Sequence, residues 1–572
     1  MPQFVLGINS SGAPMSAAIL KDGKIIAACA EERFSRIKRD LSFPHKAISF
    51  CLQEAGIQFS DLDLISSGWN PAYYMKKSSN SIYQAHKDKG LYLYYVINEL
   101  GSAEYSNSIS HVDQNLLFKD GSKIPVEYTD HHLAHLAYSY HLSGFDSAIG
   151  VILDGYGEIH AGGIFKINDT SIETIDTAKY PHSIGMFYSA ITQFLGFRPY
   201  YDEWKIMALA SMGNSKDYKD KFSQMIKVGK DAFNGVLELD LTYFDYYNFF
   251  TPGFTSDKFI EEFGIPRKND ETLEERHKNI ARALQEVVEE KIFELLSFIS
   301  KKFPSEKNLC LSGGFFMNST LNGKIRTHTS FNDPFIGPVP DDTGIAIGTA
   351  LFSVRKRGKL PKKKCIHNFF GPEYSNSQIK SELEISKIKF EELTYLEEDA
   401  AKILSEGKII GWFQGKSELG QRSLGNRSIL ASPTFDWMKD HINKFIKFRE
   451  NFRPFAPAIL DDKKTEYFRM KSDDEVYFME KVFPFLDEVK NKVPAVVHFD
   501  GTGRVQTVTK NSNPRFYKLI QEFDKITNVP VLLNTSFNTN NVPIVNSPRD
   551  AIDTFYRCGI DVLYMNNIKI TK

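Results

Sequence analysis

The chain has 572 residues, too many for one ordinary hydrophobic core, so two domains are expected. Apolar residues make up 42% and charged residues 25%, as in average globular proteins, which excludes a disordered chain and a coiled coil. The formal net charge is −1, with 70 Lys and Arg against 71 Asp and Glu, so no overall basic field attracts nucleic acid or acidic lipid.

The N-terminal sequence predicts a protein without a secretory leader. MPQFVLGINSSG lacks the basic start and long apolar stretch of a signal peptide, and no apolar run in the chain is long enough to span a bilayer. The five cysteines are scattered and form no CxxC pair, which argues against a disulfide framework and a cysteine-based zinc site. A cytoplasmic location is therefore expected.

Two similar strand–turn–strand units are predicted in the first half of the chain. Near the N-terminus, two apolar runs flank the turn KDGK at 21–24, and an Asp-Gly turn of this kind needs positive φ. A similar pattern returns with AIGVILDG at 148–155, followed by AGGIFKI at 161–167. This similarity favours an internal duplication, with two unrelated hairpins as the alternative.

A long helix and a glycine turn are predicted next. Apolar residues recur at helical spacing from Thr272 to about Phe303, which indicates a helix facing the core. The strand NLCLS follows, and Gly313-Gly314 is then expected to open a second helix whose free N–H groups could bind phosphate.

Residues 354–364, VRKRGKLPKKK, are basic and poor in apolar residues, which is typical of an exposed linker. We place the domain boundary here, with a nucleic-acid-binding patch as the alternative interpretation. The second part alternates helices with strands, which predicts an α/β or α+β domain. The helices are expected at 375–384, 396–406, 435–448 and 514–525, and the strands at KIIGWF, VPVLLN and VLYMN.

The segment DHHLAH contains a candidate metal site. Asp130 is a plausible helix cap, and His131 and His135 are four residues apart, so their rings share one helical face. Asp154 ends an apolar run and suits a third ligand, and the aspartate pair at 341–342 offers a fourth. Two imidazoles with carboxylates suit Fe(II), Mn(II) or Zn(II). Surface histidines on a polar helix are the alternative.

Glycine turns follow three predicted strands, at 7–12, 154–157 and 311–314. Glycine turns are common, so each is weak evidence on its own. Three of them, two inside a repeat, match the layout of an actin-like ATPase core, in which two related lobes hold a nucleotide.

A third candidate region begins at Gly415-Lys416-Ser417. A P-loop would need glycine at position 410, which is isoleucine, so the Walker pattern fails. What remains is a concentration of Arg and Lys among glycines, and arginine binds phosphate with two parallel hydrogen bonds. A phosphate-bearing small molecule is expected here, with a solvated basic face as the alternative. The cations include Arg422, Arg427, Lys447, Arg449, Arg453 and Arg504, and LLNTSFN adds amide side chains.

Taken together, these residues resemble the O-carbamoyltransferase family of the nodulation (NodU) and cephamycin (CmcH) type, which includes the tobramycin-type antibiotic carbamoyltransferases. The matching stretches extend along the whole chain. They are EERFSRIKRD with the following FP, DHHLAH, LDGYGE, DEWKIMALA, RHKNIARALQEVVEE, LSGGFFMNS, DDTGIAIG, GKSELGQRSLGNRSILASP, IKFRENFRPFAPAIL, HFDGTGRVQTV and LLNTSFN.

The resemblance implies an α/β enzyme of two domains. Residues 1–355 would form a duplicated actin-like core similar to the tRNA threonylcarbamoyl transferases, and residues 365–572 a YrdC-like domain. The second domain would make carbamoyl-adenylate from carbamoyl phosphate and ATP. The first would transfer the carbamoyl group to a hydroxyl with the help of a bound divalent metal. The alternatives are a relative that binds these ligands without transfer, and a tRNA-modifying enzyme, which the near-zero net charge disfavours.

The resemblance also assigns residues. The metal ligands would be His131, His135, Asp154 and Asp342, holding Fe(II), with Mn(II) or Zn(II) as alternatives, and Mg would accompany ATP. His132, Lys38 and Arg504 are the expected catalytic residues. Nucleotide and carbamoyl phosphate would bind Lys38, Lys205, Gly313, Gly314, Asn318, Arg422, Arg427, Lys447, Arg449, Arg453, Arg504 and Asn534.

The chain departs from the family pattern at positions 13–14, which are Ala-Pro where the family usually has His-Asp. The family histidine is a candidate base for the acceptor, and His132 could substitute for it. The expected partner is a small-molecule hydroxyl acceptor, which could be a sugar, an aminocyclitol, a polyketide or a toxin. Neither nucleic acid nor a membrane is expected, and a homodimer is an alternative to a monomer.

Overall fold

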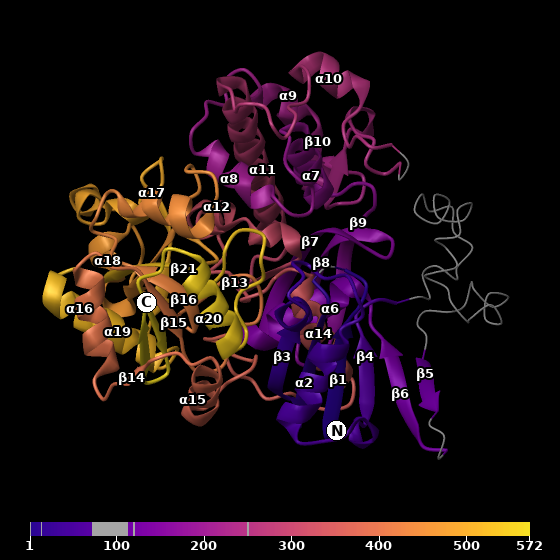
Figure 1. The fold of residues 1–572 in the computed structure, drawn as a ribbon. Coiled ribbons are helices and arrows are strands. Elements are labelled where there is room, and N and C mark those ends of the chain that lie inside the picture. The colour runs from indigo at the N-terminus through magenta and orange to yellow at the C-terminus, as the bar shows by residue number, and fades with distance from the viewer. Residues whose placement is uncertain (1, 13, 71–112, 118–120, 249–250) are drawn as a thin grey trace.

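The strand–turn–strand unit predicted at the N-terminus forms one side of a six-stranded sheet in the computed structural model (Figure 1). The structure describes residues 2–12, 14–70, 113–117, 121–248 and 251–572. The strand order is β3-β2-β1-β4-β6-β5, with β1 (Phe4–Asn9), β2 (Ser16–Lys21), β3 (Lys24–Ala30), β4 (Leu64–Ser67), β5 (Asp113–Leu117) and β6 (Lys123–Tyr128). The turn between β2 and β3 has positive φ at Asp22 (49°) and Gly23 (75°), as predicted.

A second sheet repeats this arrangement. Its order is β13-β12-β7-β8-β9, with β7 (Ser147–Gly157), β8 (His160–Asn168), β9 (Ile172–Lys179), β12 (Leu309–Ser312) and β13 (Phe335–Ile336). In both sheets the first three strands form an antiparallel meander, and the first strand also starts a parallel run, β1-β4-β6 in one sheet and β7-β12-β13 in the other. The predicted duplication is confirmed, because unrelated hairpins would not share this topology.

Each repeat ends in a helix that packs on the other repeat. α6 (His131–Ser143) follows β6 and contacts β7 and β12, whereas α14 (Ile345–Arg355) follows β13 and contacts β1, β2 and β4. The two helices also contact each other, and a Cβ atom on Gly348 would lie only 2.1 Å from the Ala134 carbonyl oxygen. Glycine is therefore needed for this close packing, which brings the start of α6 near the turn that precedes α14.

Between β9 and β12 the chain forms a helical region, which lies above the second sheet in Figure 1. The helix predicted from Thr272 to Phe303 is confirmed as α11 (Glu275–Lys302), and its apolar stripe is buried. The other elements of this region are α7 (Ile184–Phe194), α8 (Glu203–Ala210), α9 (Lys219–Gln224), β10 (Ile226–Val228), β11 (Leu237–Leu239) and α10 (Asp257–Phe263).

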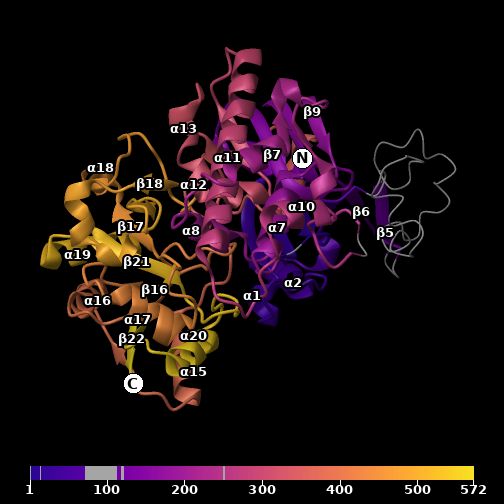
Figure 2. The same cartoon turned by 90° about the horizontal axis from the view of Figure 1, so that it is seen from above.

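The C-terminal part lies beside the N-terminal part in both ribbon views (Figures 1 and 2). Its mixed sheet has the order β14-β23-β22-β15-β16-β21-β17-β20. The strands are β14 (Glu391–Glu392), β15 (Ile410–Phe413), β16 (Arg427–Ala431), β17 (Ala456–Leu460), β20 (Gln506–Val508), β21 (Val531–Ser536), β22 (Val562–Met565) and β23 (Ile568–Thr571), and β18 (Val482–Pro484) pairs with β19 (Thr502–Arg504) outside it. The predicted α/β class is confirmed.

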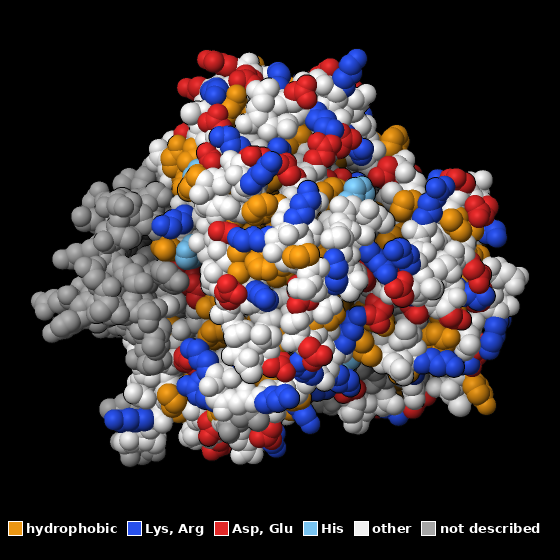
Figure 3. All heavy atoms as spheres, turned by 180° about the vertical axis from the view of Figure 1, so that it is seen from behind, with side chains coloured by type: hydrophobic (Ala, Val, Ile, Leu, Met, Phe, Trp, Pro, Cys, Tyr) orange, Lys and Arg blue, Asp and Glu red, His pale blue; other side chains and the backbone are white. Residues whose placement is uncertain are grey.

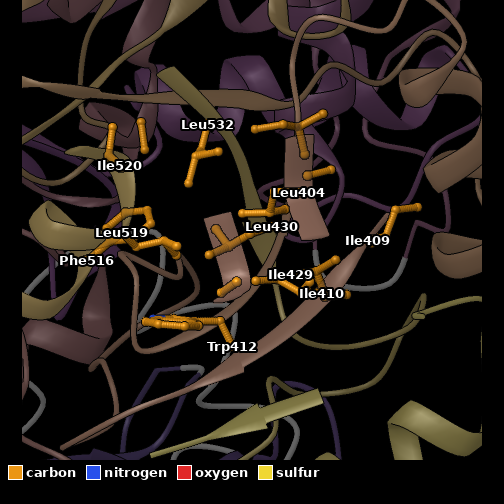
Figure 4. Close-up of a cluster of buried hydrophobic side chains, with 14 of the residues drawn as sticks. Leu404, Ile409, Ile410, Trp412, Ile429, Leu430, Phe516, Leu519, Ile520 and Leu532 are labelled. Carbon is orange, nitrogen blue, oxygen red and sulfur yellow. The ribbon is translucent and has the colours of Figure 1, made fainter. Parts of the chain in front are cut away.

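The core of this part lies on the apolar faces of the central strands. Figure 4 shows Trp412, Leu430 and Leu532 from three of them, with Phe516 from the helix that packs on the sheet. Since all four side chains are fully buried, the core holds β15, β16 and β21 in a fixed position. The helices are α15 (Asn376–Ile385), α16 (Leu396–Ser405), α17 (Met438–Ile442), α18 (Lys464–Tyr467), α19 (Pro514–Thr527) and α20 (Pro548–Arg557).

Two predicted helices differ from those observed. The segment 435–448 forms only α17 and one π-helical turn over Asn443–Lys447, which ends at Phe448 with a φ of 48°. The prediction of one helix after Gly313-Gly314 is wrong. That segment forms a 3-10 turn and the short helices α12 (Ser319–Asn322) and α13 (Ile325–His328). Asn318 has a ψ of 82°, which is not helical and separates the 3-10 turn from α12.

Much of the charge in the basic stretch 354–364 is paired with carboxylates. Lys356 and Arg357 both bind Glu127, at 2.5 and 2.7 Å, and Lys362 binds Asp146 at 2.5 Å. On the face seen in Figure 3, basic and acidic side chains are interspersed, in agreement with the net charge of −1. In the part of the chain that the structure describes, no helix combines the length and the apolar character needed to cross a membrane.

Candidate active site

One large cavity, of about 1920 Å³, is lined by residues of both halves of the chain. The N-terminal half contributes the turn after β1, the end of β7, α8 and the turn after β12. The C-terminal half contributes the glycine-rich loop before β16, the segment after α17, and β19. The residues that the sequence singles out for chemistry therefore converge on one space.

Four side chains from segments distant in sequence meet at this cavity. α6 supplies His131 and His135, β7 supplies Asp154, and the turn before α14 supplies Asp342. One possible ligand atom from each residue lies within 4.8 Å of the others. Both histidines are fully buried, whereas the two aspartates line the cavity. The fold thus brings together the four residues predicted as metal ligands.

Each histidine ring is oriented by an oxygen atom on its Nδ1 side. His131 Nδ1 lies 3.3 Å from the Gly68 carbonyl, which can only accept, so Nδ1 carries the proton. His135 Nδ1 lies 3.1 Å from Ser312 Oγ, and the Ser312 hydroxyl donates to a backbone carbonyl, so Nδ1 again donates. Both Nε2 atoms are left to face the two aspartates, which is the arrangement a metal ligand needs.

The spacing of these atoms fits one divalent ion. His131 Nε2 lies 3.1 Å from Asp154 Oδ2 and 3.5 Å from Asp342 Oδ1, and the same distances from His135 Nε2 are 3.5 and 3.6 Å. Ligands about 2.1 Å from a tetrahedral ion are about 3.4 Å apart. Two nitrogen and two oxygen ligands suit Fe(II), Mn(II) or Zn(II).

The electrostatics of the group also favour a cation. Burial opposes a charge on His131, but hydrogen bonds with Asp154 and Asp342 raise the pKa of its imidazole well above the usual value. Burial likewise opposes a charge on Asp154, but the two histidines hold its pKa well below the usual range. The buried carboxylates therefore require positive charge beside them, which a proton or a metal ion supplies.

The glycine turns around this group hold the aspartates. The Gly314 N–H donates to Asp154 Oδ1 at 2.9 Å. It is therefore not free to bind phosphate, which differs from the prediction. A Cβ atom on Gly12 would lie 1.9 Å from Asp342 Oδ2, so a larger residue there would displace this carboxylate. Gly314 and Pro14 line the cavity, Gly313 is not among the lining residues, and Ala13 lies outside the described residues.

Among the described residues of the C-terminal half, a cluster of five predicted cations also lines the cavity: Arg422, Lys447, Arg449, Arg453 and Arg504. Burial, together with Arg449 and Arg453, lowers the pKa of Lys447 well below its usual value. Burial and Arg422 lower the pKa of Arg504 to about 9. These cations lose hydration and repel one another, so a bound anion would stabilise them.

Contacts from α8 join this cluster to the N-terminal half. The Arg453 guanidinium lies 3.9 Å from the centre of the Trp204 ring, and it pairs with Glu450 at 3.2 Å. Lys205 binds the other Glu450 oxygen at 3.1 Å. Both predicted cations, Lys205 and Arg453, are therefore placed by contacts between the two halves.

The other predicted binding residues also line the cavity, each with a structural partner. Lys38 pairs with Glu32 at 3.3 Å, and Asn318 exchanges hydrogen bonds of 3.0 and 3.1 Å with Gln285. The Asn534 amide donates to Gln506 Oε1 at 2.8 Å and has an oxygen without a partner among the described residues.

Arg427 departs from the prediction, because it does not line the cavity. Its side chain is fully buried, lies over the Phe413 ring at 3.6 Å, and donates to four backbone carbonyls, those of Pro372, Gln414, Gly415 and Asn426. Its two terminal nitrogens are used by these carbonyls, and its Nε is buried and does not line the cavity, so the guanidinium is not available to a substrate phosphate. Arg427 instead fixes the shape of the loop that carries Arg422.

Replacing Arg427 with lysine is expected to lower the free energy of unfolding by about 3 kcal/mol or more, because a point charge leaves buried carbonyls without donors. The Michaelis constants of the folded fraction should stay near those of the wild type. Chemical denaturation together with steady-state kinetics checks this. A wild-type unfolding curve with a raised Michaelis constant for carbamoyl phosphate would contradict the structural role.

His132 is also placed away from the cavity. The side chain is 2% exposed, and neither ring nitrogen has a hydrogen-bond partner within the described residues. Burial lowers the pKa of its imidazole well below the usual value. A general base must reach the acceptor hydroxyl, so the position of His132 does not support the predicted role.

One cavity residue that sequence reasoning missed is His498. Its Nδ1 lies 3.1 Å from Thr502 Oγ1, whose hydroxyl donates to Asp500, so Nδ1 carries the proton. Burial lowers the pKa of His498 to about 4; Arg504 and Lys439 act in the same direction and Asp500 against it. A neutral imidazole therefore lies beside the cations. The sequence feature that could have indicated His498 is its position in HFDGTGR, six residues before Arg504.

Comparisons with known proteins identify the family of this chain. The family described as Carbamoyltransferase N-terminus matches residues 5–351, and the family described as Carbamoyltransferase C-terminus matches residues 401–572. Nodulation protein NolNO of Sinorhizobium fredii (strain NBRC 101917 / NGR234) is 33% identical in an alignment of 569 positions, gaps included, that covers 97% of this chain and 78% of that protein. Uncharacterized protein sll1178 of Synechocystis sp. is 32% identical in an alignment of 604 positions, gaps included, that covers 99% of this chain and 96% of that protein.

Proposed function

Because this chain belongs to the carbamoyltransferase family, we propose that it makes carbamoyl-adenylate from carbamoyl phosphate and ATP and transfers the carbamoyl group to a hydroxyl of a small molecule. The family establishes a transferase. The use of ATP, the metal and the acceptor class form the proposal.

The five-cation cluster supports the adenylation step. Carbamoyl phosphate and the triphosphate of ATP are strongly anionic, and arginine forks match phosphate oxygens. The balance of atoms requires that carbamoyl phosphate gives carbamate and phosphate with water. The carbamate oxygen then attacks the α-phosphorus of ATP, and pyrophosphate, accompanied by Mg, leaves. Arg504 is the residue we propose first for this role, because it lines the cavity and its guanidinium forms no hydrogen bond within the described part of the chain.

The four-residue metal group supports the transfer step. The acceptor oxygen attacks the carbamoyl carbon, the bond to the AMP oxygen breaks, and the hydroxyl proton passes to the leaving phosphate or to water. A divalent ion bound there, which we propose to be Fe(II), would act as a Lewis acid on an oxygen where charge develops. Asp154 is held for this role by the Gly314 N–H, and both histidines by their Nδ1 contacts.

The observation that carries the proposal is that both groups line one cavity. Asp154 and Asp342 of the N-terminal half share it with the cations of the C-terminal half. An activated carbamoyl group is prone to hydrolysis, so making and using it in one shared cavity would limit its loss.

The test is mass spectrometry of candidate hydroxyl compounds incubated with the full chain, ATP and carbamoyl phosphate. We expect one acceptor to gain one carbamoyl group, only when both substrates are present. Exchange of labelled pyrophosphate into ATP, dependent on carbamoyl phosphate, measures adenylation separately. Exchange without transfer to any acceptor would favour the alternative of a relative altered at positions 13–14, and absence of both would contradict the proposal.

A further inference from the structure

The hairpin between β7 and β8 carries a carboxylate that the proposed steps do not use. Glu158 follows Asp154 by four residues, and its side chain is fully buried. Its backbone has a φ of 45°, in the left-handed region that glycine and asparagine adopt more readily than glutamate. A buried carboxylate on such a backbone persists only where its contacts compensate for the strain.

Those contacts reach the first metal-site histidine. Glu158 Oε1 accepts the Asn70 N–H at 2.7 Å and the His131 N–H at 3.1 Å, and Oε2 lies 3.3 Å from the same His131 nitrogen. His131 is the first residue of α6, so its N–H has no acceptor within the helix.

The second contact leads to the same histidine by another route. Asn70 lies two residues after Gly68, whose carbonyl accepts the proton of His131 Nδ1. Glu158 therefore holds both the backbone of His131 and the segment that orients its ring. The hairpin also packs closely against His131, because a Cβ atom on Gly157 would lie 2.7 Å from His131 Cβ.

We propose that Glu158 is a positioning residue for the metal site, acting through the His131 backbone and through the segment 68–70, which orients the His131 ring. It joins the β7–β8 hairpin, which carries Asp154, to α6, which carries both histidines. The inference rests on the metal site of the proposed function. Residues that orient metal ligands change metal affinity about 10- to 100-fold when they are replaced.

The test measures binding of Co²⁺ to the full chain, from its visible absorption spectrum and by competition with a chelator. We expect Glu158→Ala to weaken Co²⁺ affinity about 10- to 100-fold and to change the spectrum. Glu158→Gln keeps an oxygen at the position of Oε1 and should recover most of the affinity. Glu158→Asp suits a left-handed backbone but is one methylene too short, so it should fold and still bind weakly.

Glu127→Gln is the matched control, because Glu127 is a buried carboxylate that pairs with Lys356 and Arg357 away from the metal group. It should lower the melting temperature without changing Co²⁺ binding. Wild-type affinity and spectrum in both Glu158→Ala and Glu158→Asp would overturn the inference. Failure of the proposed function is distinguishable, since it would appear as absence of carbamoyl transfer in the wild type.

Discussion

Replacing His135 with alanine is expected to reduce carbamoyl transfer by about 100-fold or more, a loss beyond that of an outer-shell change. Pyrophosphate exchange into ATP should stay near the wild-type level. His135 Nε2 faces both aspartates, so its removal leaves three of the four ligands and weakens binding of the ion between the carboxylates. The cation cluster belongs to the other half of the chain and loses no contact. Elemental analysis measures the bound metal, acceptor mass spectrometry measures transfer, and the exchange assay measures adenylation.

His132→Ala is the matched control for this variant. It removes the same side chain from the same helix, at a position that is buried but not turned to the cavity. We expect it to keep its metal and to keep transfer within a few-fold of the wild type. Full metal occupancy in the His135→Ala protein would show that the four residues do not form the metal site.

The local part of this site could be predicted from the sequence. The spacing of His131 and His135 places both rings on one face of a helix, and the apolar run before Asp154 places it at a strand end. The duplicated topology followed from two similar strand–turn–strand patterns. In each case the residues that form the pattern are close in sequence, so local backbone geometry determines where their side chains lie.

The rest depended on contacts between distant residues. Arg427 and Arg504 look alike in sequence, but the first gives its donors to four carbonyls around it, whereas the second faces the cavity. The cation–π contact between Arg453 and Trp204 joins the two halves across 249 positions of sequence (453 minus 204). Composition and spacing do not report which acceptor a donor reaches, so such roles follow only from the fold.

Replacing Arg504 with alanine is expected to have the second large effect, on the adenylation step that supplies the transfer step. Pyrophosphate exchange should fall about 100-fold, because hydrogen bonds between a guanidinium and an anion contribute about 1.5–3 kcal/mol each. Arg504→Lys keeps the charge but not the fork, so it should retain an intermediate rate. Metal content should be unchanged in both variants, since Arg504 is not among the metal-ligating residues.

The effect of substitution on thermal stability distinguishes Arg504 from the structural Arg427. Removing Arg504 relieves burial of a cation that has only other cations as charged partners, which lower its pKa, so the melting temperature should stay the same or rise. Arg427→Lys should do the opposite, with lower stability and unchanged Michaelis constants. If Arg504→Ala instead melts at a lower temperature and exchanges pyrophosphate at the wild-type rate, the cluster is a structural feature. Adenylation would then have to occur elsewhere in the cavity, where Lys38 and Lys205 are the remaining predicted cations.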